Sequence, residues 1–235
     1  MADSLQARCS GQAVMMQEDY QKASQAIDAQ RDGLAEAIVA RQYELQPERW
    51  QAYGSSSRQK SVRDAGYHLI YLSEALATSN PALFCDYVAW VKVLFAGLGF
   101  PDDVLVTTLE CTEHALQARL PTQLGALAAE CIALGLDELR HAPSAIESLL
   151  TEDAPLGTLA RQYQDALLQA KRQFASELIL NAVDQGTSVQ DIYLHVFQQS
   201  QHEIGRLWQM NRISVAQEHY CTAATQLMIS QLYPH

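Results

Sequence analysis

In the N-terminal half, the residue types best suited to ligand chemistry lie around Arg63 and Asp64. On a helix, residues three and four apart share a face, so Asp64 lies in line with Tyr67 and His68. Tyr71 extends the same face by another turn. A carboxylate aligned with three aromatic side chains is unusual for an ordinary core, so we expect a buried acid beside a guanidinium. The commoner arrangement, an exposed Arg-Asp pair above a Tyr/Leu core stripe, stays open.

A second candidate lies near the C-terminus, where nine residues separate Trp208 from Glu218-His219. Trp208 is expected at the end of one helix, and Glu218 and His219 in the first turn of the next. A tight turn would then place the indole and the imidazole at the same end of a bundle. The positive end of the helix dipole also favours the carboxylate of Glu218 there. An ordinary interpretation, with Trp208 filling a core and His219 on the surface, stays open.

The elements that must position these residues are helices. Apolar residues recur at three- and four-residue spacing throughout, so we expect an all-α protein. The first three expected helices cover about 15–46, 57–78 and 81–97, and two more start at 101 and 121. The last three cover about 156–184, 187–210 and 214 to near the end of the chain. Capping boxes at 187–190 and 214–217 open the last two.

Three regions follow from this pattern. Residues 1–142 are predicted to form one helical domain, and 143–154, with prolines, Ser, Thr and acidic residues in and around it, a linker. Residues 155–235 are predicted to form an antiparallel helix bundle.

Composition narrows the function classes. The net charge of -11 repels the phosphate backbones of nucleic acids, so no direct nucleic-acid binding is expected. The chain has no run of about twenty uninterrupted apolar residues, so we expect no membrane contact. The N-terminus lacks a secretory pattern, and the five cysteines are irregularly spaced, which together indicate a cytoplasmic protein with reduced thiols.

No enzyme is expected, because phosphate-loop, nucleophile-elbow and kinase motifs are missing. His195 and His202 share a helix face and could form a metal pair, although packing is the commoner use of such a face. Glu203 is interpreted as a surface charge.

The C-terminal string resembles a known family. Trp208, nine residues and then Glu218-His219, preceded by Glu203-Ile204-Gly205, is similar to the helical cap of cobalamin-dependent photoreceptors of the light-sensing repressor type. The resemblance covers about 163–233. It implies adenosylcobalamin as cofactor, with Trp208 against the adenosyl group and His219 as a cobalt ligand after light breaks the cobalt–carbon bond. Imidazole is a suitable ligand for cobalt.

In that family the cap precedes a Rossmann-like domain, whose Asp-x-His-x-x-Gly loop binds cobalt from below. No such string occurs here, and the sequence ends at Tyr233-Pro234-His235, where that domain would begin. We therefore expect a truncated piece, or a cap whose Rossmann-like half is supplied elsewhere. Alone, it would hold cobalamin weakly or not at all.

The N-terminal string resembles the chromophore helix of phycobiliproteins, which are globin-like bilin carriers. Arg63, Asp64, Tyr67 and Leu69 match the order of the family motif, and the resemblance covers about 20–120. It implies that the arginine pairs with a bilin propionate and that the aspartate accepts bonds from pyrrole N–H groups. Ser61 stands where the family has its thioether cysteine, so a biliverdin-like bilin would be held non-covalently, or through another thiol, of which Cys85 is the nearest in sequence.

A bilin module followed by a cobalamin cap resembles the photocobilins. This leads us to expect a light sensor whose output passes to a signalling partner or a homo-oligomer. The alternative is a corrinoid carrier or cap module of a methyltransferase system, with the N-terminal helices as a docking domain without pigment. A further alternative is an interaction protein without any pigment.

Overall fold

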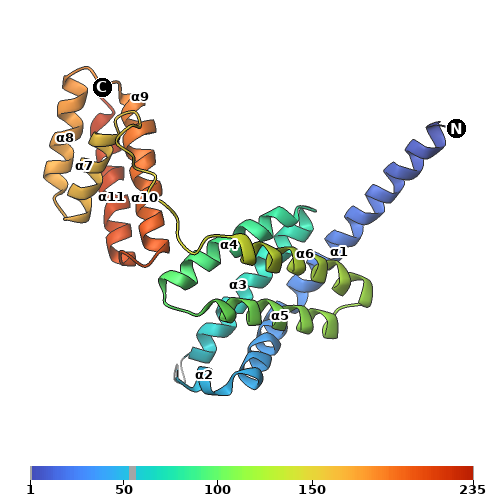
Figure 1. The fold of residues 1–235 in the computed structure, drawn as a ribbon. Helices are drawn as coiled ribbons and strands as arrows, with labels where there is room; N and C mark the ends of the chain where they lie inside the picture. Colours follow the sequence, from blue (N-terminus) through green and yellow to red (C-terminus); the bar gives the residue numbers. More distant parts are fainter. Residues whose placement is uncertain (1, 53–56, 235) are drawn as a thin grey trace. The chain divides into compact units, whose positions relative to one another are not determined.

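The computed structural model describes residues 2–52 and 57–234, and the side chains of 17–50 and 57–234. All regular secondary structure in these residues is helical, with no strand (Figure 1), so the all-α prediction is confirmed. No helix in the described part of the chain combines the length and the apolar composition needed to cross a bilayer.

The helices follow one another along the chain with short connections, except for a long segment after α6. They are α1 (Ala2–Leu45), α2 (Pro47–Ala52), α3 (Ser57–Ala77), α4 (Pro81–Gly97), α5 (Asp102–Arg119), α6 (Thr122–His141), α7 (Gly157–Leu168), α8 (Arg172–Asp184), α9 (Val189–Asp191), the π-helix η1 (Ile192–Phe197), α10 (Gln198–Gln209) and α11 (Val215–Leu232).

Contacts divide the chain into two compact units. The N-terminal unit comprises Met1–Phe95 and Phe100–Pro143, and the C-terminal unit comprises Ala96–Gly99 and Ser144–His235. Each has its own cluster of buried apolar side chains.

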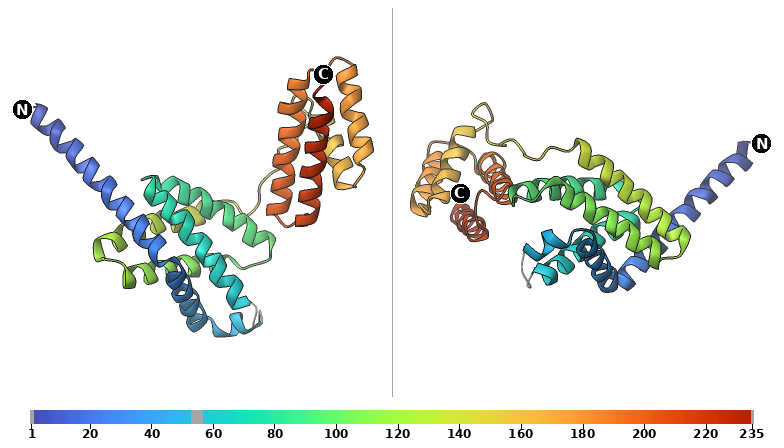
Figure 2. Two further views of the ribbon diagram at one scale, coloured as in Figure 1. Left: turned by 180° about the vertical axis from the view of Figure 1, so that it is seen from behind. Right: turned by 60° about the horizontal axis from the view of Figure 1, so that its bottom comes forward.

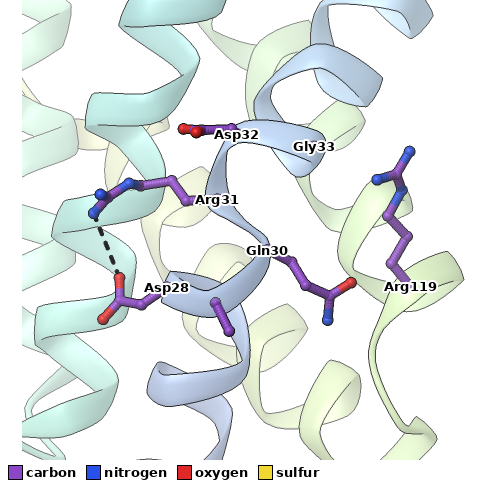
Figure 3. A pocket seen from close by; sticks show the side chains of 7 residues that line it. Asp28, Gln30, Arg31, Asp32, Gly33 and Arg119 are labelled. Carbon is purple, nitrogen blue, oxygen red and sulfur yellow. Dashed lines mark ion pairs between the residues drawn. The ribbon is translucent and has the colours of Figure 1, made fainter.

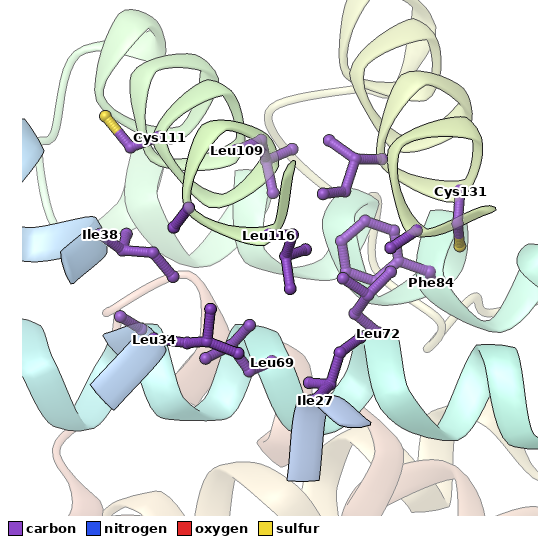
Figure 4. Close-up of a cluster of buried hydrophobic side chains, with 14 of the residues drawn as sticks. Ile27, Leu34, Ile38, Leu69, Leu72, Phe84, Leu109, Cys111, Leu116 and Cys131 are labelled. Atoms are coloured by element: carbon purple, nitrogen blue, oxygen red, sulfur yellow. The ribbon is translucent and has the colours of Figure 1, made fainter. Parts of the chain in front are cut away.

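The core of the N-terminal unit forms where α1, α3, α4, α5 and α6 meet (Figure 4). On α3 the buried face is Ala65, Leu69, Leu72 and Leu76, which follow the helical repeat. Close approach of α6 to α4 depends on Gly135, because a Cβ there would come within 2.9 Å of the Phe84 ring.

The C-terminal unit packs α7, α8, η1, α10 and α11 around Tyr163, which is fully buried. Helices α10 and α11 lie side by side as an antiparallel pair (Figure 2). Ser214 begins α11 with the predicted capping box, in which its side chain accepts from the backbone of Gln217 and the Gln217 side chain accepts from the backbone N–H of Ser214.

The predicted helix over 156–184 is wrong, since the structure ends α7 at Leu168 and starts α8 at Arg172. Ala170 lies between them with a φ of 57°, and the N–H of Lys171 reaches the carbonyl of Ala166 at 2.8 Å. This is a Schellman stop built on alanine, where glycine is the usual residue. The same motif closes α8 on Gly186, as the sequence predicted.

The capping box predicted at Thr187 is wrong, because the N-cap lies one residue later. Ser188 is the N-cap and accepts from the N–H of Asp191. The expected continuous helix after it contains the π-helix η1, which the spacing of apolar residues did not indicate.

Candidate functional site

The Arg63–Asp64 pair lies on the surface of α3. The Nε of Arg63 is 3.6 Å from the Oδ1 of Asp64, and the side chains are 66% and 55% exposed. The expectation of a buried acid is therefore wrong, because α3 packs through Ala65 and Leu69, and Asp64 lies beside that face. Partial burial raises the pKa of Asp64, and this effect outweighs the positive charge of Arg63, which lowers that pKa.

The aromatic residues predicted to share a face with Asp64 are divided between surface and core. Tyr67 is exposed, whereas His68 is buried and its Nδ1 is 2.8 Å from the hydroxyl of Tyr87. Tyr71 is half-exposed and stacks on Tyr87, with ring centroids 3.8 Å apart. Burial lowers the pKa of His68 to about 4, so this imidazole is a neutral core group.

Two of the open hollows on the described part of the N-terminal unit lie along α1. One, of about 240 Å³, is lined by residues of α1 and α3 that include Arg31, Arg63 and Tyr67. The other, of about 260 Å³, lies between α1 and Arg119 at the end of α5 (Figure 3), and Arg31 there pairs with Asp28 at 3.7 Å. Both are smaller than the roughly 300–1,000 Å³ of typical ligand pockets.

Ser61, at the position of the expected thioether cysteine, is half-buried. Its hydroxyl donates to the carbonyl of Ser57, one turn earlier on α3, at 3.0 Å.

The turn between α10 and α11 is locked at both ends. Asn211 adopts a φ of 55°. The N–H of Asn211 donates to the carbonyl of Trp208, and the N–H of Arg212 donates to the carbonyl of Leu207. Asparagine is the usual substitute for glycine in such a stop. The capping box of Ser214 then starts α11. The structure thus brings Trp208 and Glu218-His219 to the same end of the C-terminal unit.

We call the surface at this end the cap face, made of Gly205, Trp208, Val215, Glu218 and His219. Val215 is 53% exposed in the first turn of α11. A Cβ added to Gly205 would meet no atom within 4 Å, so the backbone of α10 is uncovered one turn before the indole. Trp208 is partly exposed, so it does not fill the core as the ordinary interpretation had it. The cap face therefore offers apolar surface and an imidazole together.

Glu218 and His219 form a hydrogen-bonded pair on the cap face. The Nδ1 of His219 contacts the Oε2 of Glu218, and the side chains are 75% and 26% exposed, respectively. The other oxygen of Glu218 accepts from the hydroxyl of Thr222 at 3.1 Å. A carboxylate on Nδ1 leaves Nε2 as the nitrogen for a metal, the usual arrangement of metal-ligating histidines.

Glu203 is not the surface charge that the sequence suggested. It is 4% exposed and accepts from Arg206, from the hydroxyl of Ser148 and from the N–H of Leu149. Burial alone would raise the pKa of Glu203, but these bonds outweigh it and lower the pKa. Glu203 thereby fastens the segment 144–156 to α10.

Among the described residues, no three His, Cys, Asp or Glu side chains gather as a metal site would. His195 lies 3.9 Å from Asp191, and His202 is exposed on α10. The metal pair considered for these two histidines stays a prediction.

One comparison with known proteins finds a match within the C-terminal unit. Residues 159–233 match the family model described as B12 binding domain, a stretch that contains the whole cap face. No curated protein and no solved structure shows a significant match to the chain. The match supports cobalamin and the helical cap, whereas the bilin-binding and globin-like interpretations of the N-terminal unit stay predictions.

Proposed function

We propose that this chain is a corrinoid-binding cap module, whose cap face covers one side of a cobalamin. One observation carries the proposal: within the stretch that matches a B12 binding domain, Trp208, Val215 and His219 share one end of the unit. Of these three, Val215 and His219 are exposed. A flat macrocycle that packs on this end would remove apolar surface from water, which is favourable by about 25 cal/mol per Å².

The chemistry of the cap face fits the group. The Glu218 carboxylate orients His219 so that Nε2 is available to cobalt, and imidazole is a good ligand for that metal. The uncovered backbone at Gly205 allows a planar group or its upper substituent to come close to α10. Bound cobalamin would supply a cobalt centre that carries an alkyl group, and Trp208 would exclude water from it.

A cap contacts one side of the corrin ring. The proposal therefore includes a partner that covers the other side, such as a Rossmann-like cobalamin domain or a second copy of this chain. In this proposal the protein holds and shields the cofactor, and no step of catalysis is assigned to its own residues.

Light sensing with a bilin is the second candidate. The feature that favours it is the hollow lined by Arg63 and Tyr67, where the guanidinium could pair with a propionate. A volume of about 240 Å³ and the exposed Asp64 make this a weaker site than the cap face. An absorption band of a bilin in protein made together with biliverdin would favour it, and a colourless protein would count against it.

The test is a titration of the full chain with hydroxocobalamin, followed by visible absorption. Because a cap contacts one side of the ring, we expect weak but saturable binding, and a change of the cobalt spectrum as an imidazole replaces water. His219→Ala should abolish the spectral change, and Trp208→Ala should weaken binding.

His202→Ala is the matched control, because this histidine is exposed on α10 in the same unit and lies outside the cap face. Binding that survives His219→Ala and Trp208→Ala unchanged would overturn the proposal.

A further inference from the structure

A line of polar side chains runs from Glu218 into the C-terminal unit. The Oγ1 of Thr222 is 3.1 Å from the Oε1 of Glu218 and 3.1 Å from the Oε1 of Gln201. The amide nitrogen of Gln201 is 2.9 Å from the Oγ1 of Thr225, which is 2.9 Å from the hydroxyl of Tyr163. We call these five residues the polar line. It joins α11, α10 and α7.

Exposure falls along the polar line. The side chain of Glu218 is 26% exposed, Thr225 is 3% exposed and Tyr163 is fully buried. The inner end is thus held by the core, and burial raises the pKa of Tyr163 to about 12, so its hydroxyl keeps its proton. A rigid inner end can fix the outer end, because each bond limits the rotamers of the next side chain.

In each bond of the polar line, the available protons decide which group donates and which accepts. The hydroxyl of Thr222 has one proton and faces two acceptors, and the charged carboxylate of Glu218 holds it more strongly than the amide oxygen of Gln201. If the Gln201 amide turns over, its NH₂ group donates to Thr222 and its oxygen accepts from Thr225. Tyr163 then donates to Thr225, and every proton points toward Glu218.

We propose that Thr222 and Gln201 are positioning residues for His219. By holding Glu218 in place, they keep the proton of the imidazole on Nδ1 and leave Nε2 free to bind a metal. The inference rests on the proposed function for its purpose, but the bonds that it invokes lie within the chain itself.

The test measures the tautomer of His219 by nitrogen-15 NMR of the full chain without cofactor, at about pH 9, where imidazoles are neutral. In the wild type we expect the Nδ1–H form to dominate. Thr222→Val keeps the shape of the side chain and removes the hydroxyl, so the ratio of Nδ1–H to Nε2–H should fall several-fold. Thr222→Ser restores the hydroxyl and should restore the ratio.

Ser176→Ala is the control, because it removes an exposed hydroxyl that bonds to Gln231 in the same unit. It should leave the tautomer ratio unchanged. Gln201→Met provides a second way to interrupt the polar line should Thr222→Val fail to fold, and it should lower the ratio as well.

Two results would overturn the inference: a wild-type His219 without preference for Nδ1–H, or a ratio that neither variant changes. Titration with hydroxocobalamin separates this from the proposed function. If the ratio responds to the variants but the wild type does not bind, the proposed function fails and the positioning role remains. If both hold, Thr222→Val should weaken binding about five- to tenfold.

Discussion

Each unit carries an acid directly beside a base, Arg63–Asp64 in one and Glu218–His219 in the other, yet the two pairs are supported very differently. Arg63 and Asp64 contact each other at 3.6 Å and lie largely in solvent. Glu218 also bonds to Thr222, which leads through Gln201 and Thr225 to the buried Tyr163. An adjacent acid and base become a rigid site only where the fold holds one of them from inside.

The largest expected effect concerns a third pair, Glu203–Arg206, whose side chains are 5% and 13% exposed. Glu203→Ala takes the carboxylate away from Arg206 and releases Ser148 and the N–H of Leu149, so the free energy of unfolding of the C-terminal unit should fall by about 3 kcal/mol. Urea unfolding followed by NMR signals of the C-terminal unit measures it. A loss below about 1 kcal/mol would show that the segment 144–156 is not fastened there.

Acid should distinguish the two units by the pH at which each weakens. His68 has a lowered pKa of about 4 in the folded state against 6.5 for the free group, so its stabilising effect is complete above pH 6.5 and disappears as pH falls toward 4. The loss is roughly 3 kcal/mol for a fully buried group. Glu203, whose pKa is lowered from 4.5, weakens the C-terminal unit only below that value.

Unfolding experiments between pH 7 and pH 4.5 check this difference. The N-terminal unit should lose stability over that interval, and His68→Gln should remove most of the slope. A slope that persists in the variant would assign the effect to other groups.

Two glycines with open space beside them provide a matched comparison of binding. Gly205 lies on the cap face and Gly66 beside the hollow near Arg63, and a Cβ at either would meet no atom within 4 Å. Gly205→Leu should stabilise α10 by about 0.5–1 kcal/mol and still weaken cobalamin binding at least tenfold, because the side chain covers the cap face. Gly66→Leu should leave cobalamin affinity unchanged.

Titration of both variants with hydroxocobalamin reads out the comparison. Equal affinities for Gly205→Leu and the wild type would remove Gly205 from the cap face.

The smallest expected effect concerns the exposed Arg63–Asp64 pair. Asp64→Ala should change the free energy of unfolding by less than about 0.5 kcal/mol, since ion pairs in solvent contribute little. Urea unfolding at low and at high salt would measure it. A loss above about 1.5 kcal/mol would mean that Asp64 has partners beyond Arg63.

Local signals let the sequence predict the turn at the cap face. The Ser214–Gln217 spacing is a capping box, and it placed Glu218 and His219 at the start of α11. The proline and glycine signals likewise gave α4 and the end of α8. Where bonds between near neighbours define an element, its position can be read from the sequence.

Contacts between distant residues could not be read in this way. The burial of Glu203 depends on Ser148, 55 residues earlier, and the polar line depends on how α10 packs against α11 and α7. The stop at Ala170 lacks the glycine that would have announced it, and the exposure of Asp64 follows from the face by which α3 packs. Each depends on tertiary packing, which overrides local preference.

Amide NMR of the full chain during addition of hydroxocobalamin most directly tests whether the cap face, and not the Arg63 region, holds the cofactor. We predict shift changes concentrated at Trp208, Val215 and His219, with those around Arg63 and Tyr67 unaffected. Changes concentrated around Arg63, or spread evenly over both units, would contradict a corrinoid site at the α10–α11 turn.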